Sequence, residues 1–580
     1  MSPLVVGIVP DVTGLDRVFD YTVPEDMAPL IEMGTRVRVT LNGRRIGGWV
    51  VRIGSDASSS ELSLRPIEKV SGIGPDEDVI SLCTWASWRW CAARLRPFLV
   101  TATSANMVSR PAPRFRTAVR AEPSSPAATD LLQRGGGVLR LPPSDDQMPA
   151  ILSAARHGPA LVVVAGLDNA RVLAARLRRT GITVALMPDD WAMARGGVDV
   201  VIGSRATAFA PCPSLAVAVV IDEHDESLQE ERSPTWHARD VLAERARRTG
   251  VPLLLISPCP SLDATFERIV VAPPRERERN AWPEVVIADP GEAPPWKRSL
   301  LSSDLIAALR DESKRVACVI NVKGQSRLLA CRSCQSLVRC LECGGALVEE
   351  QSDRLDCRVC TTSHPRLCNL CGSTSLARVR PGVSRLREEL TAAAQREVIA
   401  VVAGAKDEVD DTKGDVFVGT EALLHRVRRI DVVAFLDFDP ELLAPRFRAG
   451  EQAFAMLARA ARLVGPRRGG GQLIIQTTLS DHPVIQSAIQ GDPSIISEFE
   501  RQRRETLGLP PFSAMAVIEG PGAEQFIKAL QQEAGEVSAV AYRDRWLVRA
   551  VDHDILSAAC ATVDRVPGSK IRIEVDPPRL

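Results

Sequence analysis

Eight of the fourteen cysteines lie in one short segment and form four CxxC pairs. The pairs are Cys331/Cys334, Cys340/Cys343, Cys357/Cys360 and Cys368/Cys371. Two intervening residues allow both thiolates of a pair to face one ion across a tight turn, and two pairs complete a tetrahedral shell. Thirteen residues separate the central pairs, a spacing close to that of a zinc-ribbon hairpin. The segment 330–373 is therefore predicted to bind two zinc ions.

The simplest assignment of the eight ligands is a nested one. The inner pairs bind one ion, and the outer pairs meet at the base of the segment to bind the other. Redox chemistry and an iron–sulfur cluster are the alternatives, and the repeated, evenly spaced pairs disfavour the first of these. Four thiolates leave no position for a water molecule, so a structural role is expected for both ions.

A second group of residues suggests nucleotide chemistry. Asp222–Asp225 follows an apolar stretch and has the pattern of a DExH box, in which a strand-end acid holds Mg²⁺. Such a site also needs a phosphate-binding loop, GxxxxGK[ST], but no lysine of the chain follows a glycine. The segment 135–146 takes the expected place and carries two acids, which would repel phosphate. A solvated strand-to-helix turn is therefore the favoured interpretation of Asp222–Asp225.

Length and composition limit the setting of these groups. A chain of 580 residues is too long to fold around a single hydrophobic core, so more than one domain is expected. Basic and acidic residues balance at 72 each. Neither a long apolar stretch nor the basic start of a signal peptide is present, so no membrane association is expected. We predict a cytoplasmic location, where reduced thiols favour metal ions over disulfides.

The elements that must position these residues follow from the apolar pattern. Residues 4–54 alternate apolar and polar residues as in a small β-domain, and residues 77–98 have a helical pattern. Continuous apolar strands alternate with helical segments from about 129 to 260 and again from about 300, which is typical of two parallel α/β sheets. The predicted domains are 1–108, a linker 109–128, 129–284, 285–480 with the cysteine insertion 330–373, and 481–580.

Short motifs occur in an order that resembles the PriA family of primosomal replication-restart proteins, which are superfamily-two DNA helicases. The matching segments are Phe19-Asp20-Tyr21-x-x-Pro24, Gly34-x-Arg36-Val37-x-Val39, Gly203–Phe209, Glu223-His224-Asp225, His237–Asp240, Asn321–Gly324, the four CxxC pairs, Gly419–Glu421, Arg446–Glu451, Leu509–Phe512 and Val575–Pro577. Each motif is weak alone, but their order together with the cysteines is specific.

The resemblance implies a multidomain α/β protein: a small β-rich amino-terminal DNA-binding domain, two helicase-like parallel α/β lobes, a zinc-binding insertion in the second lobe, and an α+β carboxy-terminal domain. It implies binding to branched or forked DNA that has a 3′ end, with Phe19 stacking on the terminal base and Asp20 accepting a hydrogen bond from the 3′-hydroxyl. Arg44 and Arg45, beside Gly43 on a hairpin, suit phosphate contact. For Phe19 the alternative is an aromatic residue of the core. For Arg44 and Arg45 the alternative is a solvated turn. Primosome proteins and single-stranded-DNA-binding protein are the implied partners.

The departures from the family pattern lie in its nucleotide motifs. The first acid of the family's DEEH falls on Ile221, and Leu463 and Pro466 stand where the paired arginines of QVAGRAGR belong. Residues 110–137 are too few for the family's winged-helix domain. We therefore expect a fork-binding protein that recruits primosome partners and is not an enzyme. A helicase with an atypical nucleotide site and a zinc-ribbon protein of transcription or RNA metabolism are the alternatives.

Overall fold

The computed structural model describes residues 4–15, 17–54, 64–117, 124–289, 300–320, 383–401, 414–563, 565 and 570–577, and, of the segment 329–378, all but 332, 335, 337, 343–346, 352, 353 and 358–361. The chain divides into two compact units. Unit 1 comprises Met1–Leu141, Asp146–Pro273 and Ser497–Leu580, and unit 2 comprises Pro142–Asp145 and Pro274–Ile496. Among the described residues, none of the helices has the length and apolar character needed to cross a membrane.

A five-stranded antiparallel sheet forms near the amino terminus, as the alternating pattern predicts. In spatial order its strands are β2 (Phe19–Val23), β1 (Leu4–Pro10), β4 (Arg44–Ile53), β3 (Arg36–Leu41) and β5 (Lys69–Gly72). Val6 and Ile8, two positions apart on β1, both point into its apolar core. Asn42 and Gly43 have φ of 50° and 76°, the positive values that a two-residue hairpin between β3 and β4 requires.

Lobe 1 is a seven-stranded parallel sheet, which the continuous apolar runs predict. Its strands, in spatial order, are β12 (Val270–Val271), β6 (Gly136–Arg140), β11 (Leu253–Ser257), β10 (Val217–Ile221), β7 (Ala160–Val164), β9 (Val200–Gly203) and β8 (Val184–Leu186). Its helices are α3 (Pro126–Gln133), α4 (Met148–His157), α5 (Leu167–Arg179), α6 (Trp191–Gly196), α7 (Ala238–Thr249) and the short α8 (Leu262–Thr265).

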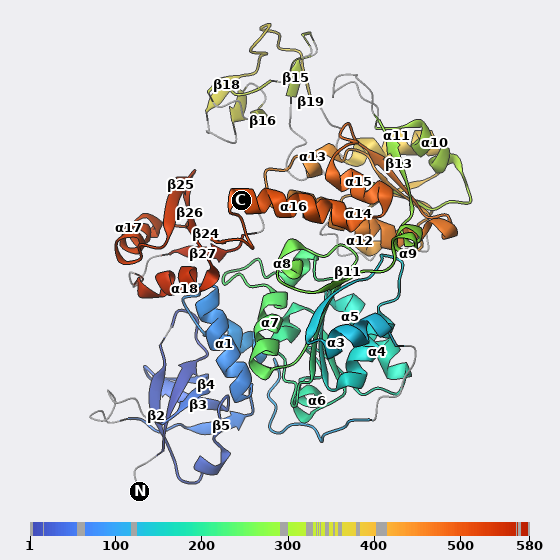
Figure 1. Ribbon diagram of the computed structural model, residues 1–580. Coiled ribbons are helices and arrows are strands. Elements are labelled where there is room, and N and C mark those ends of the chain that lie inside the picture. Colours follow the sequence, from blue (N-terminus) through green and yellow to red (C-terminus); the bar gives the residue numbers. More distant parts are fainter. Residues whose placement is uncertain are drawn as a thin grey trace. The chain divides into compact units, whose positions relative to one another are not determined.

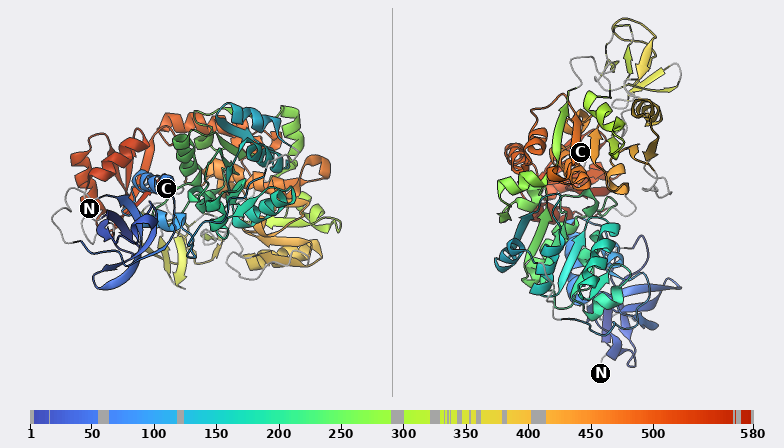
Figure 2. Two further views of the ribbon diagram at one scale, coloured as in Figure 1. Left: turned by 90° about the horizontal axis from the view of Figure 1, so that it is seen from below. Right: turned by 90° about the vertical axis from the view of Figure 1, so that its right-hand side faces the viewer.

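Both faces of the lobe 1 sheet are covered, because alternate strand residues enter different cores (Figures 1 and 2). Val219 and Ile221 pack with Leu131 of α3 and other residues of α3, α4 and α5. Val220 packs in a core that also contains residues of α7, α1 (Glu77–Arg89) and α2 (Arg96–Ala102). The predicted helix at 77–98 is thus two helices, and both pack in the core of lobe 1.

Lobe 2, in unit 2, repeats the parallel architecture with six strands. In spatial order they are β13 (Glu284–Ala288), β23 (Gln472–Gln476), β22 (Val432–Phe435), β14 (Val316–Val319), β21 (Val416–Gly419) and β20 (Val398–Val401). Its helices are α9 (Arg275–Ala281), α10 (Ser303–Arg310), α11 (Val383–Ala394), α12 (Leu423–Arg426), α13 (Asp439–Leu442), α14 (Ala449–Val464) and α15 (Pro483–Gln490). Helix α16 (Pro493–Leu507) continues from unit 2 into unit 1.

The cysteine segment interrupts lobe 2 between β14 and β20, as the sequence predicts. Two small antiparallel sheets form it. One pairs β15 (Leu329–Cys331) with β19 (Leu376–Arg378), and the other contains β16 (Leu347–Gln351), β17 (Arg354–Cys357) and β18 (Ser363–Pro365). Their core is made largely of cysteine and leucine side chains.

The carboxy-terminal part of unit 1 is an antiparallel sheet with two helices. Its strands are β25 (Ser538–Tyr542), β26 (Arg545–Ala550), β24 (Ala514–Glu519) and β27 (Arg572–Val575), and its helices are α17 (Ala523–Glu533) and α18 (His553–Thr562). Asp576 follows β27 and connects three parts of the unit. Its Oδ2 lies 3.2 Å from Nη2 of Arg89 on α1 and 2.7 Å from Nε2 of His553. Its carbonyl accepts a hydrogen bond from Gln229 of lobe 1 (3.4 Å).

Candidate nucleic-acid interface and metal centre

Asp20 is held by an ion pair that crosses a strand. Its carboxylate accepts a hydrogen bond from the Arg52 guanidinium, although β2 and β4 are not neighbours. Strand β1 runs between them, and its Gly7 is opposite Asp20 on one side and Arg52 on the other. A Cβ on Gly7 would lie 3.1 Å from Cβ of Arg52 and 2.9 Å from Cγ1 of Val18. The absence of a side chain at Gly7 therefore gives Arg52 its path to Asp20.

The other predicted DNA contacts divide into two places. Phe19 is partly buried at the edge of the amino-terminal core, next to Asp20, so its ring has both a packing role and an accessible part. Gly43, Arg44 and Arg45 lie together at the β3–β4 hairpin. Arg44 is eight positions from Arg52 along β4, about 25 Å at the usual rise of a strand. The hairpin is therefore well separated from Asp20.

The hairpin arginines differ in their surroundings. Both side chains are exposed, and Arg45 forms an ion pair with Glu68. The Thr40 hydroxyl donates a hydrogen bond to the same carboxylate. This hydrogen bond and the charge of Arg45 lower the pKa of Glu68. Arg52 and Gly7 were not among the predicted site residues, because only the register of three strands brings them to Asp20.

Asp222–Asp225 lies at the carboxyl end of β10, but its interpretation as a solvated turn is wrong. Asp222 is 4% exposed and Glu223 1%. Both carboxylate oxygens of Asp222 lie 3.2 Å from Nε2 of Gln147, and the residue has a φ of 54°. Glu223 accepts hydrogen bonds from the backbone N–H (2.7 Å) and hydroxyl (2.8 Å) of Ser261. The two carboxylates can be buried because these donors form hydrogen bonds with their oxygens.

Arg239, from the segment His237–Asp240, supplies the buried positive charge beside this motif. Its guanidinium lies 3.4 Å from Glu223, 2.9 Å from Asp240 and 3.9 Å from Asp263. Burial lowers the pKa of Arg239, but the carboxylates of Asp240, Asp263 and Glu223 raise it further, so the group stays charged. The acidic motif is thereby joined to α7 and α8.

The loop that replaces a phosphate-binding loop follows β6, and arginines hold its two acids. Asp146 accepts two hydrogen bonds from Arg176, at 3.0 and 2.5 Å. Burial raises the pKa of Asp146, but hydrogen bonds from Arg176 and the Met148 N–H lower it further. Asp145, whose contacts lie in unit 2, accepts a hydrogen bond from Arg277 (2.8 Å).

In lobe 2, the matching motif Gly419–Glu421 contacts α14. Glu421 follows β21, and its Oε1 lies 3.5 Å from Nη1 of Arg459 on α14. The same guanidinium nitrogen is 2.7 Å from Nε2 of His425. Arg462, close to the place of the family's paired arginines, donates a hydrogen bond to the carbonyl of Pro143, which also belongs to unit 2. Asn321–Gly324 lies outside the described residues.

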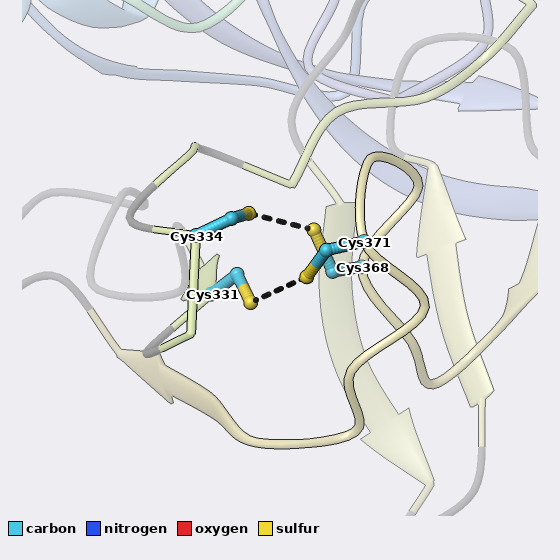
Figure 3. A group of neighbouring side chains, drawn as sticks. All are labelled: Cys331, Cys334, Cys368 and Cys371. Carbon is cyan, nitrogen blue, oxygen red and sulfur yellow. Dashed lines mark hydrogen bonds between the residues drawn. The ribbon is translucent and has the colours of Figure 1, made fainter.

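The outer cysteine pairs converge, as the nested assignment predicts (Figure 3). The thiol sulfurs of Cys331, Cys334, Cys368 and Cys371 all lie within 4.8 Å of one another. Cys331 is 3.4 Å from Cys371, and Cys334 is 3.5 Å from Cys368. Ligands of a tetrahedral zinc ion with bonds of about 2.3 Å stand roughly 3.8 Å apart, so small movements suffice to bind one.

Hydrogen bonds favour the thiolate form of Cys331 and Cys368. At Cys371 the Ser373 N–H lowers the pKa, but hydrogen bonding with Cys331 and Cys334 raises it further, to about 12. Burial raises the pKa of Cys368, but the Ser336 hydroxyl and backbone N–H groups lower it further, to about 6. The backbone N–H of Cys334 lowers the pKa of Cys331. Of the inner set, Cys340 and Cys357 are buried in the core of the segment, whereas Cys343 and Cys360 lie outside the described residues.

Comparison with known proteins agrees with these features. A family model described as the PriA 3′DNA-binding domain (3′BD) matches residues 7–100. The chain is 29% identical over 570 residues to the "Probable replication restart protein PriA" of Mycobacterium tuberculosis, covering 87% of this chain and 85% of that protein. It is 25% identical over 372 residues to the "Replication restart protein PriA" of Bacillus subtilis, covering 58% of this chain and 45% of that protein.

The chain thus spans less than half of the Bacillus relative and most of the mycobacterial one. A solved DEAD box protein from Methanococcus jannaschii has a TM-score of 0.30 and 7% identity, covering 63% of this chain and 90% of that chain. The fold is that of a multidomain α/β protein with two parallel sheets, and its amino-terminal part matches a 3′ DNA-binding domain. The resemblance to the PriA family is confirmed, and the chain is a relative of the PriA replication restart proteins.

The prediction that the chain is not an enzyme is contradicted. The chain is similar over 87% of its length to a protein named as a probable replication restart protein PriA, and this likeness points to an enzyme. That prediction rested on short motifs that lack the expected residues. The described parts of both lobes instead hold Asp222, Glu223, Glu421 and Arg459 in defined positions by other contacts. A departure from the expected motif residues does not show that a site is lost when the surrounding sheet is retained.

The strand-crossing ion pair gives a testable prediction. Gly7→Ala places a methyl group where Arg52 passes, so Asp20 loses its orientation. We expect roughly tenfold weaker binding to DNA with a recessed 3′ end, because a hydrogen bond to a charged group contributes about 1.5 kcal/mol or more. The affinity for this DNA is measured by fluorescence anisotropy. Gly47→Ala is the matched control, since a Cβ there meets only ordinary contacts at 3.8 and 3.9 Å. Equal affinity of the two variants would contradict the prediction.

Proposed function

We propose that this protein acts in replication restart by binding branched or forked DNA through the 3′ end of a strand. The observation that carries the proposal is the fixed carboxylate of Asp20, which lies beside the partly exposed ring of Phe19 within the segment matched by the 3′ DNA-binding family model. Asp20 accepts the hydrogen bond of the terminal 3′-hydroxyl, and Phe19 stacks on the terminal base, which is worth about 1–3 kcal/mol.

The hairpin arginines have a different part in this proposal. Because Arg44 and Arg45 lie about 25 Å along the strand from the Asp20 site, they contact phosphates at a distance from the terminal base. They add affinity that depends on salt and does not depend on the chemistry of the 3′ end. The proposed site of action is the cytoplasm, and the proposed partners are primosome proteins and single-stranded-DNA-binding protein.

A second candidate activity is ATP-dependent unwinding of DNA through an atypical nucleotide site. It is favoured by Asp222, which stands at the carboxyl end of a parallel strand, where related folds place the acid that holds Mg²⁺. Gln147 orients its carboxylate at 3.2 Å. None of the eight lysines follows a glycine, so the usual phosphate-binding loop is not part of this candidate site.

The metal-binding segment is proposed to hold two zinc ions. Cys331, Cys334, Cys368 and Cys371 form the outer site, and their convergence supports a four-thiolate shell. The inner site is formed by Cys340, Cys343, Cys357 and Cys360. Of these, Cys340 and Cys357 are buried in the small core that also contains Cys331 and Cys368. Both sites stabilise the segment, which serves as a platform in lobe 2.

The 3′-end proposal is tested with three ligands: a fork with a recessed 3′-hydroxyl, the same fork with a 3′-phosphate, and an RNA duplex. The hydroxyl fork should bind most tightly, because a phosphate brings negative charge to the carboxylate of Asp20. Asp20→Ala should remove most of the difference between the two forks, whereas Arg44→Ala should weaken both equally. Equal binding of the two forks by the unaltered protein would end the terminus-binding proposal, and preference for RNA would favour a role in RNA metabolism.

The unwinding proposal is tested by ATP hydrolysis in the presence and absence of forked DNA. Turnover should rise with DNA, and Asp222→Ala should lower it about 10²–10³-fold, the usual loss for one preorganised electrostatic group. Asp168→Ala, an exposed acid on α5, is the control. Turnover that does not respond to DNA or to Asp222→Ala would contradict this candidate.

The zinc proposal is tested by metal analysis of the purified full chain. Two zinc ions per chain are expected, and Cys334→Ser, which removes one ligand of the outer site, should leave one. Iron in place of zinc would contradict the identity of the metal. One zinc ion in the unaltered chain would contradict the inner site.

A further inference from the structure

A basic segment of the predicted linker carries an exposed aromatic ring. The segment is Arg110–Thr117, which reads Arg-Pro-Ala-Pro-Arg-Phe-Arg-Thr. Phe115 is 63% exposed, more than any other described phenylalanine, and Arg110 and Arg114 are exposed as well. A single apolar residue on a surface is common and needs no explanation by itself. The meaning of the ring therefore depends on how the segment is held and on what its arginines contact.

Backbone hydrogen bonds attach the segment to the edge of lobe 1. The Ala112 N–H donates to the carbonyl of Ala192 on α6, and the Phe115 N–H donates to the carbonyl of Gly197, both at 3.0 Å. The Phe115 carbonyl accepts a hydrogen bond from the Thr183 hydroxyl, also at 3.0 Å. Because both backbone groups of Phe115 are engaged, its ring projects from a fixed position on the lobe.

Asp199 secures the end of the segment. It is 1% exposed, and its carboxylate accepts hydrogen bonds from the Thr117 hydroxyl (2.8 Å) and the Thr183 hydroxyl (2.7 Å). Burial raises the pKa of Asp199, but the hydrogen bonds from Thr183 and Thr117 lower it further, so the carboxylate stays charged. Arg116 lies 3.7 Å from the same carboxylate. This arginine therefore belongs to the attachment of the segment.

The other two arginines of the segment are available for a ligand. Among the described residues, neither Arg110 nor Arg114 has an ion pair or a hydrogen bond through its side chain. Asp190, at the start of α6, is already paired with Arg178 at 2.8 Å. The prolines at 111 and 113 favour an extended backbone between the two arginines. Two unpaired guanidinium groups along an extended segment suit an anion whose charges repeat, such as a phosphate backbone.

The exposed ring distinguishes between duplex and single-stranded DNA. In a duplex the faces of the bases are covered by their neighbours in the stack, so a ring on a protein surface meets only edges and backbone. In a single strand a base can stack on an aromatic side chain, whatever its sequence. A fixed phenylalanine next to unpaired arginines is the combination that binds single strands without sequence preference.

We propose that the segment Arg110–Thr117 is a binding site for single-stranded DNA, in which Phe115 stacks on one base while Arg110 and Arg114 contact neighbouring phosphates. The proposal goes beyond the binding of a 3′ end, because this contact needs neither a terminus nor a branch. It assigns a function to a segment that the sequence alone marks as a linker.

The test uses the full chain and a labelled circle of single-stranded DNA, which offers no 3′ end to Asp20. Affinity is measured by fluorescence anisotropy. Phe115→Ala should weaken binding roughly tenfold, within the range for the loss of one base–aromatic stack. Phe115→Trp, which retains a ring, should bind like the unaltered chain. A circle that lacks its bases but keeps its phosphates should bind the unaltered chain and Phe115→Ala equally.

The arginines are tested by the dependence of affinity on salt. Arg110→Ala and Arg114→Ala should each weaken binding to both circles. Each should also lower the slope of log affinity against log salt by about 0.7, the value for one phosphate contact on a single strand. Arg171→Ala and Val172→Ala, which alter exposed side chains of α5, are the controls and should bind like the unaltered chain.

Unchanged affinity of Phe115→Ala for the DNA circle would overturn the proposal. An equal loss on the circle without bases would also overturn it, because stacking would then not be the cause. An equal loss on a duplex circle would assign the segment to duplex DNA, and a greater loss on an RNA circle would assign it to RNA. The 3′-end proposal fails or stands separately, because it depends on the difference between two forks and not on a circle.

A matching thermal unfolding transition for Phe115→Ala and the unaltered chain is expected, since the ring is largely exposed. A lower transition for Phe115→Ala than for Phe115→Trp would overturn the binding role in favour of a packing role.

Discussion

The carboxylate of Asp576 is the interaction on which the organisation of unit 1 depends. It pairs with Arg89 at the end of α1 and with His553 at the start of α18, and the backbone carbonyl of the same residue binds Gln229 of lobe 1. Arg89 is 7% exposed, so its charge needs a counter-ion, and loss of one partner of a buried pair costs several kcal/mol. A single acid thus joins the amino-terminal domain, lobe 1 and the carboxy-terminal sheet.

This junction explains how a small sheet can hold the proposed terminus-binding site in a defined geometry. Helices α1 and α2 share an apolar core with one face of the lobe 1 sheet and with the carboxy-terminal sheet. The amino-terminal sheet is therefore packed against the rest of unit 1 and is not joined to it by a flexible linker alone. Within that sheet, the ion pair between Asp20 and Arg52 crosses β1 only because Gly7 has no side chain. Rigidity at the site comes from these two constraints together.

Paired charges occur in both lobes, buried in lobe 1 and partly exposed in lobe 2. Glu223 is held by Ser261 and Arg239, and Glu421 contacts Arg459. Sequence patterns mark these residues as motif members but do not indicate their partners, which come from other strands and helices. The favoured interpretation of Asp222–Asp225 failed for this reason: acids at the end of a strand look solvated until the covering helix and its arginine are placed.

The sequence by itself determined the cysteine pairs, the order of the motifs, the alternating and continuous strands, and the interruption of the second sheet. These features depend on spacing between near neighbours, which local geometry converts directly into turns, strands and ligand pairs. Only the tertiary structure decided that Arg52 reaches Asp20 across Gly7, that Arg44 lies far from both, and that the segment Arg110–Thr117 is held against lobe 1. Those contacts depend on strand register and on packing between distant segments, which residue spacing does not encode.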